Sequence, residues 1–98
     1  MLMRRTKTLT MGELLGDFFA QPWVAAKVAE GRLPELWREC VGEAAAAATQ
    51  RFELRGRVLN VHVSSSVLRS ELFMRREALK NELNRRSKVP LIDRIVIR

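Results

Sequence analysis

The chain has 98 residues and a net charge of +7, and hydrophobic residues make up 47% of it. This length suits one small domain with a single core. No apolar run approaches the roughly 20 residues that a bilayer-spanning helix needs, and the basic N-terminus lacks the apolar stretch of a signal peptide. We therefore expect a cytoplasmic protein with no membrane partner.

Cysteine and histidine are too scarce for several kinds of site. Cys40 is the single cysteine and His62 the single histidine, which excludes an intrachain disulfide and argues against a zinc site built from protein ligands. The chain also has no nucleophile elbow, no phosphate-cradling glycine loop and no paired carboxylate motif. We expect a protein that is not an enzyme and that uses no metal, cofactor or small-molecule substrate.

The positive charge is concentrated in the last third of the chain. Residues 1–30 and 31–60 each carry a net charge of +1, whereas residues 61–98 carry nine basic and four acidic side chains, a net charge of +5. With a sequence pI near 11.0, this asymmetry indicates a polyanionic partner, nucleic acid before membrane.

The chain divides into a short arm and one domain. Residues 1–8 (MLMRRTKT) show no periodicity and are expected to form a flexible basic arm. Arg4 and Arg5 in this arm are candidate contacts to nucleic acid. Periodic patterns follow the arm and continue to the last residue, so residues 9–98 are predicted to be a single α+β domain.

Helical patterns fill the first half of this domain. A short amphipathic helix is predicted to end before Pro22. A second short helix is expected over 23–30, closed by Gly31 in a left-handed conformation. The strongest helical pattern covers 33–49, where apolar residues recur every three or four positions. Cys40 lies on this apolar stripe and is interpreted as a small core residue rather than a nucleophile.

The pattern then changes to period two. Apolar and polar residues alternate over 52–55 and 59–64, and Gly56 between them supplies a turn, so a β-hairpin with one apolar face is predicted. His62 falls on the polar face and is interpreted as an exposed strand residue. The β-branched segment 91–97 predicts a third strand.

The stretch 64–88 is predicted to be one long helix, capped by the serines at its start. Four leucines recur along it at helical spacing and share one narrow arc: Leu68, Leu72, Leu79 and Leu83. This arc is apolar and should cover the apolar face of the hairpin. The element order is then three helices, a hairpin, a long helix and a final strand, an α+β fold with a three-stranded sheet.

A basic row that includes one aromatic residue lies a quarter turn from the leucine arc. It consists of Arg69, Phe73, Arg76 and Lys80, spaced i, i+4, i+7 and i+11. Such cations can hold phosphates, and the ring can stack on a base. The same pattern is typical of a solvated helix face, and the helix taken alone favours that second interpretation.

Several short motifs follow one another in a characteristic order. They are Trp37 with Val41-Gly42, the strand Gly56-x-x-Leu59-x-Val61, the helix start Ser65-Ser66, Glu71-Leu72 and Leu83-Asn84, preceded by Arg4-Arg5 and Gly12-x-Leu14-Leu15. In this order the chain resembles the DciA family of bacterial proteins, which includes a helicase operator that helps place the replicative helicase on DNA. The resemblance implies a fold similar to a K-homology domain, with DNA and the replicative helicase as partners. Because the chain lacks the Gly-x-x-Gly loop of ordinary K-homology domains, basic side chains must provide any grip on DNA.

The uneven positive charge, the basic row and the resemblance to the DciA family together predict a DNA-binding accessory protein of replication. Such a protein would help recruit or load the replicative helicase on single-stranded DNA. The residues expected to bind nucleic acid are Arg69, Phe73, Arg75, Arg76, Lys80, Arg85 and Arg86, with Arg4 and Arg5 of the arm.

The alternative function is an adaptor that docks on a protein partner without touching DNA. Exposed Trp23 and Phe73 would be its anchors, because aromatic residues dominate interface energetics. Salt distinguishes the two, since phosphate binding falls steeply with ionic strength and apolar docking does not. The sequence also leaves open that the chain keeps the fold without the loading role.

Overall fold

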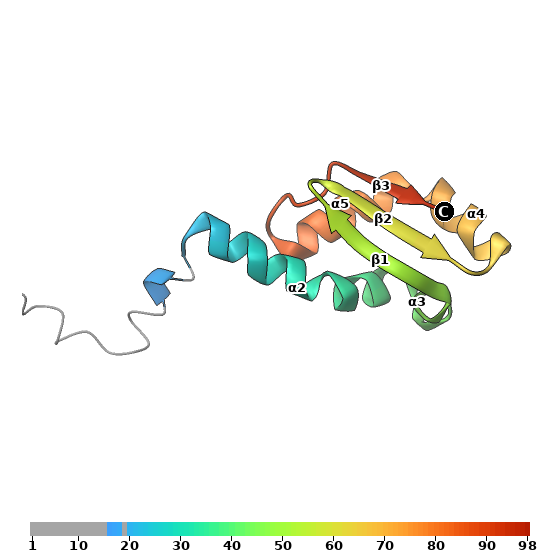
Figure 1. Ribbon diagram of the computed structural model, residues 1–98, viewed down its shortest axis with the longest axis horizontal. Helices are drawn as coiled ribbons and strands as arrows, with labels where there is room; N and C mark the ends of the chain where they lie inside the picture. Colours follow the sequence, from blue (N-terminus) through green and yellow to red (C-terminus); the bar gives the residue numbers. More distant parts are fainter. Residues whose placement is uncertain (1–15, 19) are drawn as a thin grey trace, which may run out of the picture.

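The computed structural model describes residues 16–18 and 20–98. The arm 1–8 and most of the helix expected before Pro22 lie outside these residues. The elements in chain order are α2 (Pro22–Val41), α3 (Glu43–Ala48), β1 (Thr49–Arg55), β2 (Val58–Val63), α4 (Ser66–Met74), α5 (Arg76–Ser87) and β3 (Arg94–Ile97) (Figure 1). Helices and a mixed three-stranded sheet confirm the predicted α+β class.

The sheet has the order β1-β2-β3, with β2 in the centre. Strands β1 and β2 form the predicted antiparallel hairpin, in which Phe52 pairs with Val61 and Leu54 with Leu59. Gly56 lies in the turn with a φ of 61°, a left-handed conformation that glycine adopts without steric cost. Strand β3 runs parallel to β2, so α4 and α5 form the crossover that a parallel pair requires.

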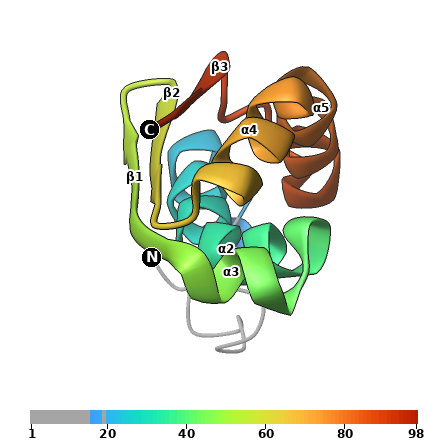
Figure 2. The same ribbon diagram turned by 90° about the vertical axis from the view of Figure 1, so that its right-hand side faces the viewer.

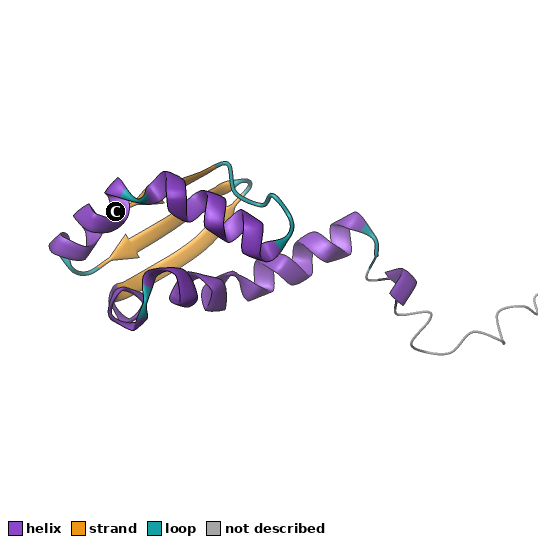
Figure 3. Ribbon diagram, turned by 180° about the vertical axis from the view of Figure 1, so that it is seen from behind, coloured by secondary structure: helices purple, strands orange, loops and turns teal. Residues whose placement is uncertain are grey.

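All the labelled helices lie on one side of the sheet (Figures 2 and 3). Helix α2 packs against α5, while α4 contacts β2 and β3 and α5 contacts β3. Within the described part of the chain no helix covers the opposite side of the sheet. The described residues therefore form two layers, and none of their helices lies on the second face of the sheet, which we call the open face.

The core lies between these two layers. Leu72, Leu79 and Leu83 are at most 3% exposed. They belong to one buried cluster with Leu59, Val61 and Val63 of the central strand, so the predicted cover of the hairpin by the leucine arc is confirmed. Each leucine buried in this way contributes about 1.5–3 kcal/mol relative to an exposed one.

Helix α2 corrects the prediction of separate helices over 23–30 and 33–49. It is continuous from Pro22 to Val41 and contains both Gly31 and Pro34. Gly31 therefore does not end a helix. That role belongs to Gly42, whose φ of 92° separates α2 from α3. A glycine costs about 1 kcal/mol and an internal proline about 3 kcal/mol in a helix. The burial of four α2 side chains in the common core offsets this cost: Ala29, Leu33, Leu36 and Trp37.

The single helix predicted over 64–88 is wrong, because Arg75 interrupts it with a φ of −98° and a ψ of 6°. The predicted serine cap is confirmed at Ser65, whose Oγ accepts a hydrogen bond of 3.3 Å from the Leu68 amide. The interruption lets α4 pack on β2 and β3 while α5 reaches α2. Leu72 and Leu79 thereby enter the same core from two helices instead of one.

The third strand is shorter than the predicted segment 91–97. Strand β3 begins at Arg94, and Leu91 and Ile92 precede it as buried residues outside the strand. Asn84 of α5 holds this turn in place. Its Nδ2 donates to the Ile92 carbonyl at 2.9 Å, and its Oδ1 accepts from the Ile92 amide at 3.0 Å. The Asn84 side chain therefore occupies the backbone groups that a strand would have used.

Candidate nucleic-acid interface

The last turn of α4 carries an exposed aromatic residue between two arginines. Phe73 is 50% exposed, and it lines a shallow hollow with Arg69, Ser70, Met74 and Ile97. We call Arg69, Phe73 and Arg76 the Phe73 patch. These three members of the predicted basic row lie together although the helix is interrupted between them.

Arg76 fixes the orientation of the ring. Its guanidinium carbon lies 4.0 Å from the centre of the Phe73 ring, and its Nη1 donates to the Phe73 carbonyl at 2.8 Å. A cation–π contact at an exposed site contributes about 0.5–1 kcal/mol. The pair therefore presents one face of a ring beside a fixed positive charge.

Arg69 lies against the end of the central strand. Its Nη2 donates to the carbonyl of Val63 at 3.4 Å. Its Nε is buried and has no hydrogen-bond partner in the described part of the chain. Because this Nε is buried, an anion in solvent cannot reach it.

The other predicted cations of α5 are engaged with carboxylates of the protein itself. Lys80 Nζ lies 3.0 Å from Glu77 Oε1, and the Lys80 side chain is only 21% exposed. Arg85 and Arg86 both donate to Glu82. These hydrogen bonds, first that from Arg85, lower the pKa of the Glu82 carboxyl to about 2.

Two further contacts join the helices through these residues. Arg86 also reaches Glu39 of α2, with 3.0 Å between Nη1 and Oε1. Arg75, at the helix interruption, directs Nη2 to the carbonyl of Cys40 at 3.5 Å. The structure thus brings Arg69, Phe73 and Arg76 together, whereas the remaining predicted residues of this region make contacts within the protein.

Cys40 is half-buried and packs against the edge of the core. Burial raises the pKa of its thiol above the ordinary value, and a thiol with a raised pKa is a poor nucleophile. Its position at the core edge agrees with the interpretation as a packing residue.

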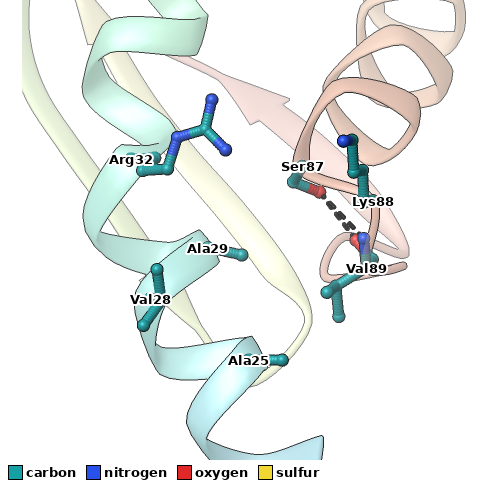
Figure 4. Close-up of a pocket in the computed structure, with 7 residues that line it drawn as sticks. All are labelled: Ala25, Val28, Ala29, Arg32, Ser87, Lys88 and Val89. Atoms are coloured by element: carbon teal, nitrogen blue, oxygen red, sulfur yellow. Dashed lines mark hydrogen bonds between the residues drawn. The ribbon is translucent and has the colours of Figure 1, made fainter. Parts of the chain in front are cut away.

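A second hollow lies between α2 and the chain after α5 (Figure 4). Its lining is mainly apolar and comes from Ala25, Val28, Ala29 and Val89. Arg32 and Lys88 also line it and add positive charge. Neither cation has an ion pair within residues 16–18 and 20–98. None of the residues predicted to bind nucleic acid lines this hollow, although Ser87 and Lys88 directly follow Arg86 in the chain.

The open sheet face carries a third group of polar residues, which the sequence did not bring together. Arg51, Glu53 and Arg55 of β1 and Asn60 and His62 of β2 line one polar depression. The alternation in each strand was visible in the sequence, and His62 does lie on the polar face as predicted. The sequence did not show that β3 pairs with β2 and extends this face.

Comparison with protein families decides where the chain belongs. The family model described as "Dna[CI] antecedent, DciA" matches residues 10–97. The chain belongs to the DciA family. No curated protein and no solved structure matches it. The predicted likeness to a K-homology domain therefore stays a prediction.

Membership of the DciA family gives the general function. The family takes part in loading the replicative helicase during DNA replication and interacts with that helicase. It is an accessory family and is generally non-enzymatic. In the described residues no helix is long and apolar enough to cross a membrane, and no group of three potential metal ligands occurs.

Proposed function

We propose that this DciA-family protein binds single-stranded DNA directly while it helps recruit or load the replicative helicase in the cytoplasm. The observation that carries the proposal is the Phe73 patch, an exposed ring flanked by two arginines at the end of α4. Single-stranded DNA offers unstacked bases and phosphates, and proteins bind it with aromatic platforms in positively charged grooves. The patch provides both groups at the junction of α4 and α5.

The Phe73 patch needs no base-specific contacts for this role. Stacking on an aromatic ring tolerates every base, and phosphate contacts carry no sequence information. Binding should therefore be independent of sequence and strongly dependent on salt. Arg75 adds a positive charge at the helix interruption, and Lys80, Arg85 and Arg86 would contact phosphates only in competition with Glu77, Glu82 and Glu39. Arg4 and Arg5 of the arm would add contacts that do not depend on the fold.

The adaptor function has an observation of its own. The hollow between α2 and α5 combines an apolar lining with Arg32 and Lys88, which have no ion pair in the described part of the chain. Trp23, nearby in sequence, is 62% exposed. An amphipathic helix with acidic residues at its edge would fit such a hollow. The adaptor would use this surface for the helicase and leave DNA untouched.

A titration of labelled single-stranded DNA distinguishes these functions. It is made at two salt concentrations, with and without the replicative helicase. Direct DNA binding by the protein alone, weakened steeply by salt, supports the proposal. Retention of DNA only when the helicase is present, with little salt dependence of the protein–helicase contact, supports the adaptor.

A further inference from the structure

The uncovered side of the sheet is a cationic surface built from all three strands. Figure 1 views the sheet with the helices behind it, and Figure 3 views it from the helix side. Side chains alternate between the two faces of a strand. Phe52, Leu54 and Leu59 belong to or pack against the core on the helix side of the sheet. The residues that alternate with them along each strand therefore face the open side.

The pairing register aligns these residues across the strands. Arg51 of β1 lies opposite His62 of β2. Four residues further along β1, Arg55 lies opposite Val58, and Val58 lies opposite Arg94 of β3. The open face therefore holds arginines on both edge strands.

Arg98 extends this surface beyond β3. Its amide donates to the Val61 carbonyl at 2.8 Å, and its carbonyl accepts from the Val63 amide at 2.9 Å. These bonds continue the parallel ladder, so the alternation places Arg98 on the same face as Arg94. We call Arg51, Arg55, Arg94 and Arg98 the sheet-face arginines.

Most of this charge is not neutralised by the protein. Glu53 is the acidic residue among these open-face positions and lies 3.4 Å from Arg55. Arg51, Arg94 and Arg98 have no ion pair in the part of the chain that the structure describes. Four arginine side chains and one glutamate side chain give this surface a net side-chain charge of +3.

We propose that the sheet-face arginines bind the phosphate backbone of duplex DNA. The surface is basic, and the described strands place no Phe, Trp or Tyr on it, so it lacks a platform for unstacked bases. Four residues of strand separate Arg51 from Arg55, about 13 Å at 3.3 Å per residue. The arginines on the two edge strands can therefore reach more than one phosphate of a duplex backbone.

This inference rests on the proposed function in that the partner is DNA, but it assigns the duplex to a different surface. The Phe73 patch holds the single strand, and the sheet-face arginines hold the neighbouring duplex. Ile97 lines the Phe73 hollow, and Arg98 directly after it lies on the open face. The two surfaces therefore meet at the end of β3, and DNA with a junction of duplex and single strand can contact both.

The test is the double variant Arg51→Glu/Arg94→Glu, titrated with a short blunt duplex and with a single strand of the same length. Both positions are exposed, so the thermal melt should match that of the parent. Two lost phosphate contacts should flatten the slope of log affinity against log salt for the duplex by about 1.8. We expect duplex affinity to fall roughly tenfold at low salt, with single-strand affinity changed much less.

Matched controls separate a local contact from a change in net charge. Lys27→Glu/Arg38→Glu on α2 makes the same charge change at exposed positions away from the sheet and should lower duplex affinity far less. Parent-like duplex binding by the sheet variant overturns the inference, as does an equal loss in the control. If the sheet variant keeps duplex binding and loses the helicase instead, the surface binds an acidic protein. If the parent binds duplex and not single strand, the proposed function fails and this inference stands.

Discussion

The guanidinium of Arg76 lies over the ring of Phe73, 4.0 Å from its centre, although the two residues belong to different helices. Phe73 lies near the end of α4 and Arg76 begins α5, so the contact bridges the interruption at Arg75. The same interruption that buries the leucines in the core therefore leaves a ring and a cation stacked at the surface. This pair is the centre of the proposed contact with single-stranded DNA.

Reversal of the two arginines beside this ring should weaken single-strand binding. In Arg69→Glu/Arg76→Glu two phosphate contacts become repulsive, and each contact contributes about 0.7 to the salt slope for a single strand. We expect weaker binding that is uniform across sequences and a slope flattened by more than about one unit. Fluorescence anisotropy at several salt concentrations measures both quantities.

The control for that variant is Lys27→Glu/Arg38→Glu, which makes the same charge change on α2. Stability should barely change in the control, because both of its positions are exposed. Arg69→Glu/Arg76→Glu loses the hydrogen bond from Arg69 to the Val63 carbonyl, so its thermal melt is compared with that of the parent before binding is measured. If Arg69→Glu/Arg76→Glu binds single-stranded DNA like the parent, the row is a solvated helix face and the adaptor function takes its place.

Removal of the carboxylate at Glu82 should release positive charge on α5. Glu82 accepts hydrogen bonds from Arg85 and Arg86. In Glu82→Gln both guanidiniums become more available to phosphates, so affinity for single-stranded DNA and its salt dependence should increase. Glu77→Gln, which removes the partner of Lys80, is the matched comparison. Unchanged affinity in Glu82→Gln would remove Arg85 and Arg86 from the interface.

The same carboxylate makes stability depend on pH in acid. The folded protein holds the pKa of Glu82 at about 2, below the ordinary value of 4.5. The unfolded chain therefore binds a proton first, and the contribution of Glu82 to stability is complete above pH 4.5 and is lost as the pH falls towards 2. Urea midpoints measured across this range should fall less in Glu82→Gln than in the parent. High salt should reduce the difference, because the side chain is 34% exposed.

Truncation of the buried leucine on α4 should destabilise the domain. Leu72 is 1% exposed, and Leu72→Ala in such a site costs about 2–5 kcal/mol of unfolding free energy. Met74 on the same helix is 83% exposed, so Met74→Ala should change stability by less than about 0.5 kcal/mol. Urea unfolding followed by circular dichroism compares the two. A loss below about 0.5 kcal/mol in Leu72→Ala would contradict the assignment of α4 to the core.

Deletion of residues 1–8 should separate binding from folding. The segment has no apolar periodicity, so its removal should leave the melting temperature nearly unchanged. Arg4, Arg5 and Lys7 are lost with it, and single-strand affinity should fall with a salt slope reduced by up to about 2. A variant with these three residues changed to Ser tests charge without the change in length. A large drop in melting temperature after deletion would show that the segment packs on the domain.

The sequence by itself determined the features that depend on local periodicity. Alternation of apolar and polar residues specified the hairpin, because a shift of one residue would turn Phe52 and Leu54 to the solvent. Helical spacing identified Leu72, Leu79 and Leu83 as core residues, and a serine before an apolar helix identified the cap at Ser65. Each of these features follows from neighbours within a few positions along the chain.

Only the tertiary structure decided where helices continue and where they end. Gly31 and Pro34 are locally unfavourable in a helix, yet α2 passes through both. Arg75 is locally favourable, yet the chain breaks there. Packing of the whole core outweighs these local preferences of about 1–3 kcal/mol per residue. The pattern of one segment cannot show this, because the packing energy depends on residues from the other segments. For the same reason the meeting of Arg51 and Arg94 on one face could not be predicted, because it depends on the register between strands that lie far apart in the sequence.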